Sequence, residues 1–143
     1  MGEALHVEAT WTGELSALAS ARGHELRVDE PVDAGGGDLG MMPTELMVAA
    51  LSSCFCLAVA HVASKRDIEL PGLRVTVDAE RIGSELRYGR LRIEVAAASG
   101  AHDLAALVQR ARRFCWVSNM LASDLEVTYV PVVLPDPAPA DAG

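Results

Sequence analysis

The sequence predicts an α+β fold in which an antiparallel sheet packs against helices. Strand-like segments with alternating apolar and polar residues come in runs, and two helix-like segments separate these runs. The chain has 143 residues, 50% of them apolar, which is enough to fill the core of one domain. We expect a single domain over residues 1–134 and a disordered tail over 135–143, where the sequence reads PDPAPADAG.

The first part of the chain is predicted to consist of strands joined by turns. The predicted strands cover residues 5–11, 15–18 and 25–28. Gly13 ends the first strand, and a turn at Arg22-Gly23-His24 separates the other two. The glycine-rich segment 33–40 that follows is predicted to be a flexible loop.

A long helix is predicted over residues 43–65, with Pro43 at its first position and Glu45 in its first turn. Residues 46–63 carry no formal charge over 18 positions, which is the lower length limit of a membrane span. Two serines, two cysteines and a histidine inside this stretch argue against a span. We therefore expect the helix to lie at the centre of a core that a second subunit helps to cover, with no membrane involved.

The second part of the chain is predicted to hold three more strands and a second helix. The predicted strands cover residues 73–79, 86–95 and 125–133, and the helix begins near Ala101. Gly89 predicts a bulge, and Pro131 predicts an edge strand or an end to pairing. Near the helix, charged residues complement its dipole: Asp103 at the start and Arg110, Arg112 and Arg113 at the end.

The charge balance excludes several classes of partner. Twenty acidic against 12 basic side chains give a net charge of −8, which argues against binding to nucleic acid or to an anionic membrane surface. Three cysteines are an odd number, and no basic segment opens the chain, so a secreted disulfide-bonded domain is not expected. We expect a soluble protein of the reducing cytoplasm.

The cysteines are the candidate reactive groups. Cys54 and Cys56 stand two positions apart in the predicted helix, so they point about 200° away from one another and do not share a site. His61 lies about 10 Å along the axis from Cys54, too far to act as its base, and is expected to be a core or interface residue. No spacing of Cys54, Cys56, His61 and Cys115 is typical of zinc ligands, so neither a metal nor a cofactor is expected.

Two segments carry a resemblance to a known family. Residues 40–46, GMMPTEL, and 49–54, AALSSC, resemble the G-x-x-P-x-E-L-L-x-A-A-L-x-x-C signature of OsmC/Ohr proteins, the osmotically inducible and organic hydroperoxide resistance proteins. Residues 115–119, CWVSN, resemble the second signature, with Trp116 in place of the usual proline. The likeness extends over nearly the whole chain to about Leu134.

The resemblance implies a fold, an assembly and a reaction. The fold is an antiparallel sheet wrapped around a long central helix, in an intertwined homodimer with two active sites at the subunit interface. By matching position, Cys54 is the peroxidatic cysteine and Cys115 the resolving cysteine, whereas Cys56 is expected to be a core residue. A dithiol, in some members a lipoyl group, reduces the disulfide that the two cysteines form.

The sequence departs from the organic hydroperoxide branch at two places. Thr44 follows Pro43 where that branch has glutamate, so the acid lies one position later, at Glu45. Arg22 is the first arginine of the chain, and we expect it, ahead of Arg27, to support the reactive thiol. These differences suggest a divergent OsmC-like member.

The function that we favour is a cysteine-based peroxidase of the oxidative stress response, an oxidoreductase acting on organic hydroperoxides. The apolar neighbours of Cys54 suit alkyl or lipid hydroperoxides better than hydrogen peroxide. Two alternatives stay open: a non-enzymatic dimer that binds an apolar small molecule at its interface, and a thiol redox sensor.

Overall fold

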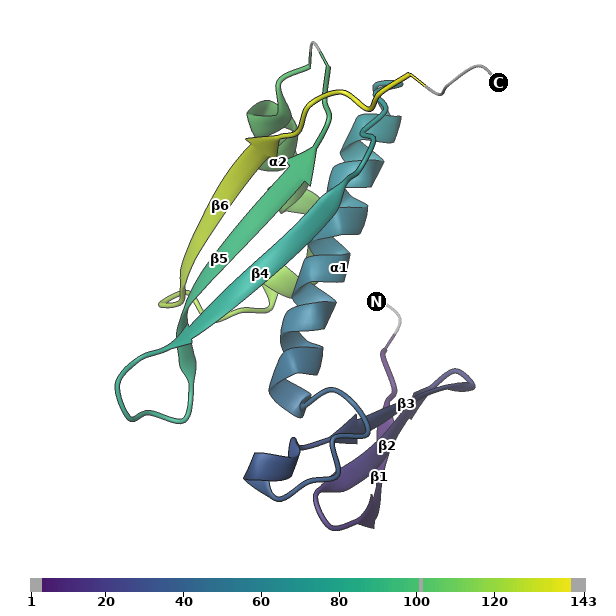
Figure 1. Cartoon of the computed structure of the whole chain (residues 1–143), viewed down its shortest axis with the longest axis vertical. Helices are drawn as coiled ribbons and strands as arrows, with labels where there is room; N and C mark the ends of the chain where they lie inside the picture. Colours follow the sequence, from purple (N-terminus) through teal and green to yellow (C-terminus); the bar gives the residue numbers. More distant parts are fainter. Residues whose placement is uncertain (1–3, 101, 140–143) are drawn as a thin grey trace. The chain divides into compact units, whose positions relative to one another are not determined.

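The computed structural model describes residues 4–100 and 102–139 and divides the chain into two compact units. The first unit covers Met1–Met47 and the second covers Val48–Gly143. Both are built from a three-stranded sheet and helical segments, which confirms the α+β prediction (Figure 1). The long helix α1 begins in the first unit and continues through the second.

The sheet of the first unit is an antiparallel meander. Strands β1 (Glu8–Gly13), β2 (Ser16–Ala21) and β3 (His24–Asp29) pair in chain order, close to the predicted strands (Figure 1). Arg22 and Gly23 form the two-residue turn between β2 and β3, and both have a positive φ, at 53° and 82°. This geometry fits the right-handed twist of a hairpin, but it is unfavourable for an arginine, which has a Cβ atom.

The glycine-rich loop after β3, which is predicted to be flexible, makes specific contacts with that strand. The buried carboxylate of Asp29 accepts hydrogen bonds from the backbone N–H groups of Gly37 and Leu39, at 3.2 and 3.1 Å. A Cβ atom on Gly40 would lie 2.3 Å from the carbonyl oxygen of Arg27, so the close approach of the two backbones requires glycine there. The loop therefore leads the chain into α1 along a defined path.

Helix α1 covers Pro43–Ser64, one residue short of the prediction. Pro43 occupies its first position, where the missing N–H group costs no hydrogen bond. The Glu45 carboxylate accepts a hydrogen bond from the backbone N–H of Met42 at 2.9 Å, as in a capping box. By length and composition, α1 would suffice to cross a membrane.

The sheet of the second unit corrects the antiparallel prediction. Strand β4 (Arg74–Arg81) pairs antiparallel with β5 (Tyr88–Ala97), but β5 pairs in parallel with β6 (Glu126–Val133). A parallel pair needs a crossover connection, and here the segment that contains helix α2 (Leu104–Ala111) supplies it (Figure 1).

Single residues explain three details of this unit. Gly89 lies at the predicted bulge, where the register of β4 and β5 shifts. Pro131 lies on β6, which is an edge strand, as predicted. The Asp103 carboxylate caps α2 by accepting from the N–H of Ala106 at 3.1 Å. The helix therefore begins at Leu104, whereas the predicted start at Ala101 lies outside the described residues, as do 140–143 of the predicted tail.

One core fills the second unit. The apolar face of β5 packs against buried side chains of α1 and α2, while the opposite face of β5 carries arginines in ion pairs with acidic neighbours. The core residues of α1 follow helical spacing: Leu51, Phe55, Ala58, Val59 and Val62. The opposite side of α1 is exposed, with Leu57 at 71%. The helix is thus buried on one side only within a single chain.

Candidate active site

Cys54 lies on α1 at the edge of the buried side of the helix. Leu51, one turn earlier, and Phe55, next in sequence, are both core residues, and the Cys54 side chain packs against the same cluster. Cys54 is half-buried, in contrast to the fully buried core residues beside it. The surroundings within the helix are apolar, as predicted.

Cys115 lies in the core of the second unit. It follows the short helix η2 (Arg112–Phe114) and is the N-cap residue of α3 (Trp116–Asn119). Its exposed fraction is 0%. The core packing brings the thiol groups of Cys54 and Cys115 close enough to influence one another, although 60 residues of chain separate them.

The surroundings of Cys115 favour its protonated form. Burial raises the pKa of the Cys115 thiol, and the neighbouring Cys54 sulfur raises this pKa further. The hydroxyl and backbone N–H groups of Ser118 oppose this effect and lower the pKa of Cys115. Ser118 also donates a hydrogen bond to the Cys115 carbonyl oxygen at 3.0 Å, which holds it beside the cysteine. The pair therefore consists of one half-buried cysteine and one buried thiol whose raised pKa favours the protonated form.

Two further residues lie elsewhere than expected. Cys56 is half-buried and is not part of the core cluster around Cys54 and Cys115. His61 is exposed, and its ring packs against the ring of Phe114 with centroids 5.2 Å apart. His61 is therefore not a core residue, because position 61 falls on the uncovered side of α1, and its expected place at an interface stays a prediction. All three cysteines are free thiols.

The other predicted site residues, Arg22 and Glu45, belong to the first unit. Arg22 is exposed at the tip of the β2–β3 turn, and its positive φ makes it a strained position. Glu45 is exposed, and one of its carboxylate oxygens is occupied by the N-terminus of α1. The sequence interpretation had missed this capping role of Glu45 and the contact of Ser118 with Cys115. The contact of Ser118 with Cys115 could have been predicted, because a serine three residues after the cysteine that starts a helix can reach its carbonyl oxygen.

No group of three or more histidine, cysteine or acidic side chains within residues 4–100 and 102–139 is arranged to hold a metal ion. Within the second unit, Cys54 and Cys115 are the two thiols that the fold brings close together.

A comparison with known protein families tests the resemblance that the two cysteine motifs carry. The family model described as OsmC-like protein matches residues 35–130. The chain belongs to the OsmC family. The match includes both Cys54 and Cys115, together with the segment around Pro43 and Glu45. No curated protein matches the chain.

Solved structures of OsmC-family proteins share the fold at low sequence identity. An OsmC-like protein from Mycoplasma pneumoniae is 15% identical, with a TM-score of 0.78 over 94% of this chain and 100% of that one. An organic hydroperoxide resistance protein from Legionella pneumophila is 20% identical, with a TM-score of 0.69 over 92% and 98%. Another, from Elizabethkingia anophelis, is 22% identical, with a TM-score of 0.69 over 94% and 99%.

The raised pKa of Cys115 can be measured in a variant with one thiol, Cys54→Ser with Cys56→Ser. We expect the ultraviolet absorbance of the thiolate to appear at higher pH in the folded protein than in denaturant, where the midpoint is about 8.5. Burial remains in this variant and keeps the pKa raised. Because the folded-state pKa is the higher one, the stability that this thiol contributes is complete below the unfolded-state pKa and is lost as the pH rises through the folded-state value.

Ser118→Ala in the same background should move the midpoint further up, because it removes a hydroxyl that lowers the pKa of Cys115. A folded-state midpoint at or below that of the denatured protein would contradict the assignment of Cys115 as a buried, protonated thiol.

Proposed function

We propose that the protein is a thiol peroxidase that reduces organic hydroperoxides through Cys54 and Cys115. The observation that carries the proposal is the pairing of a half-buried cysteine with a fully buried one. An accessible sulfur is suited to meet a substrate, and a buried neighbour is suited to react only with that sulfur. Some OsmC-family proteins of the same fold bear the name organic hydroperoxide resistance protein, which supports the proposal.

The first step takes place at Cys54. Its thiolate attacks the outer oxygen of the hydroperoxide, so that an S–O bond forms and the O–O bond breaks. The alcohol leaves after taking up a proton, and Cys54 becomes a sulfenic acid. Cys54 packs against the apolar core that contains Leu51 and Phe55 and has no charged side chain in that cluster, which supports a substrate with an alkyl chain.

The second step closes the disulfide. The sulfur of Cys115 attacks the sulfenic sulfur of Cys54, an S–S bond forms, and the hydroxyl group leaves as water with the proton of the Cys115 thiol. The raised pKa of Cys115 keeps that proton in place until the sulfenic acid forms. An external dithiol, such as a lipoyl group, then restores both thiols by exchange and is itself oxidised to a disulfide.

The three cysteines should differ in their effect on turnover of cumene hydroperoxide. We expect Cys54→Ser to abolish peroxide consumption, because the nucleophile is lost. Cys115→Ser should allow one oxidation per site and then leave Cys54 to become sulfinic acid, which mass spectrometry detects as two added oxygens. Cys56→Ser is the matched control on the same helix and should keep the wild-type rate within about twofold, since Cys56 lies outside the pair.

Full consumption by Cys54→Ser would exclude the proposed nucleophile. An inactive wild-type protein would instead favour the non-enzymatic dimer that binds an apolar ligand.

We further propose that Arg22 supplies the positive charge that favours the Cys54 thiolate and that Glu45 orients this arginine. Arg22 lies in a turn and has a positive φ, which is strained for a residue with a Cβ atom. Strained residues of this kind cluster at functional sites, which supports the proposal. One carboxylate oxygen of Glu45 caps α1. The other oxygen could accept a hydrogen bond from the guanidinium group of Arg22, because a carboxylate can bind a guanidinium group through a single oxygen.

Arg22→Ala should slow both the alkylation of Cys54 and the reduction of cumene hydroperoxide about tenfold or more, the factor that corresponds to one charge-assisted contact. The fold should persist, since Arg22 is exposed. Arg27→Ala, a change of the same charge in the next strand, is the matched control and should have little effect. The assignment is wrong if the two variants are equally active or if only Arg27→Ala is slow.

We also propose that the protein is a soluble, cytoplasmic homodimer. The uncovered side of α1 carries small and apolar side chains without a charge: Ala50, Ser53, Leu57 and Ala60. An apolar face of this length is unfavourable in water, and a second copy of the chain would bury it. This arrangement accounts for the long uncharged helix as a core helix and not as a membrane span.

Leu57→Asp should convert the dimer into a monomer in analytical ultracentrifugation at micromolar concentration, because a carboxylate buried without a partner costs about 3 kcal/mol. Leu86→Asp, in a turn where the leucine is 98% exposed, should leave the dimer intact. Sedimentation of the wild-type protein as a folded monomer would contradict the proposed assembly.

A further inference from the structure

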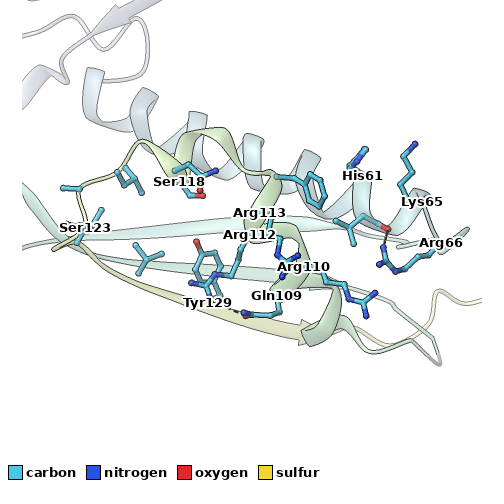
Figure 2. A pocket seen from close by; sticks show the side chains of 17 residues that line it. His61, Lys65, Arg66, Gln109, Arg110, Arg112, Arg113, Ser118, Ser123 and Tyr129 are labelled. Carbon is cyan, nitrogen blue, oxygen red and sulfur yellow. Dashed lines mark hydrogen bonds between the residues drawn. The ribbon is translucent and has the colours of Figure 1, made fainter. Parts of the chain in front are cut away.

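A wide cavity of about 1160 Å³ lies in the second unit, and neither Cys54 nor Cys115 lines it, although Phe114 and Ser118 beside Cys115 do. It is bounded by the end of α1, by α2 and η2, and by α3 and β6 (Figure 2). This volume is slightly above the usual range of small-molecule sites, about 300–1,000 Å³. The cavity is therefore large enough for a ligand with more than one recognition element.

The cavity concentrates positive charge in an acidic protein. Five of its lining residues are permanent cations: Lys65, Arg66, Arg110, Arg112 and Arg113. No aspartate or glutamate lines it, although the whole chain has a net charge of −8. In the part of the chain that the structure describes, the ion pairs involve other arginines, on the β-sheet and its β4–β5 turn. The positive charge of the cavity is thus not balanced by the carboxylates described.

Two of these side chains are held in place. The guanidinium group of Arg112 lies 4.6 Å from the ring centroid of Tyr129 and donates to the Gln109 side chain at 3.2 Å (Figure 2). The Tyr129 ring in turn packs against the core residue Phe55, at 5.1 Å between centroids. Arg66 donates to the Val62 carbonyl oxygen at 3.2 Å. This part of the cavity is therefore pre-organised before any ligand binds.

The helix dipole alone does not account for this arrangement. Cations are favoured at the C-terminal ends of α1 and α2, which explains single residues such as Arg110. The dipole does not require cations from both helices to line one cavity, where their mutual repulsion is unfavourable. A bound anion would remove that cost.

We propose that this cavity binds a small molecule that carries a diphosphate group beside an apolar or aromatic body. Four of the five cations are arginines, whose planar guanidinium groups bind phosphate oxygens in pairs. Phe114, Leu121 and Tyr129 supply apolar wall for the body of the ligand. An extended polyanion such as DNA is disfavoured because the rest of the chain is acidic and repels it.

Calorimetric titration with ADP, inorganic pyrophosphate and adenosine at constant ionic strength tests the proposal. We expect saturable binding of ADP and pyrophosphate, with ADP the tighter of the two, and no binding of adenosine. Arg110→Gln and Arg113→Gln should each weaken ADP binding about tenfold, as expected for the loss of one charge-assisted hydrogen bond. Arg74→Gln, an exposed arginine of β4 outside the cavity, is the matched control and should bind ADP as the wild type does.

Four results would overturn the proposal. These are the absence of saturable ADP binding, equal binding of adenosine and ADP, an equal loss in Arg74→Gln, and binding of a DNA duplex in preference to ADP. If Arg110→Gln changed the oligomeric state in ultracentrifugation, the cavity would instead be part of an interface between two copies, and the proposal would also be wrong. None of these measurements depends on peroxidase activity.

Discussion

The packing of one side of α1 against β5 and α2 is the interaction on which the rest of the second unit depends. Leu51, Phe55 and Val59 bury their side chains in the shared core, and this fixes the rotation of the helix about its axis. Cys54 then lies at the edge of the buried side, half accessible and next to the core position of Cys115. The placement of the pair is a consequence of helix rotation, because a turn of 100° per residue places Cys56 away from it.

The elements of the fold could be predicted from local patterns, but their directions could not. The alternation of apolar and polar residues in β5 and β6 predicted both strands, and glycine predicted the bulge at position 89. The same alternation is found in parallel and antiparallel strands, so the parallel pairing of β5 with β6 was missed. The long connection through α2 was the clue, because an antiparallel neighbour needs only a short turn.

The candidate site was predictable only in part. The identity of its cysteines could be predicted from sequence motifs, whereas their protonation depends on the tertiary structure. The motif resemblance selected Cys54 and Cys115, and the structure brings these residues together. The protonated state of Cys115 was not predictable, since it depends on burial by segments distant in the sequence. The cations near the end of α2 were visible in the sequence, but the helix dipole was a sufficient local explanation. Their convergence with Lys65 and Arg66 from α1 required the tertiary structure.

The central claim is that helix packing selects one pair among three thiols. Peptide mapping by mass spectrometry, after one equivalent of cumene hydroperoxide and quenching of free thiols, tests this claim most directly. The account predicts an intramolecular disulfide that links the peptide of Cys54 to the peptide of Cys115. Cys56 should stay outside the disulfide and be recovered in alkylated form. A disulfide between Cys56 and Cys115, or one that joins two copies of the chain, would contradict it.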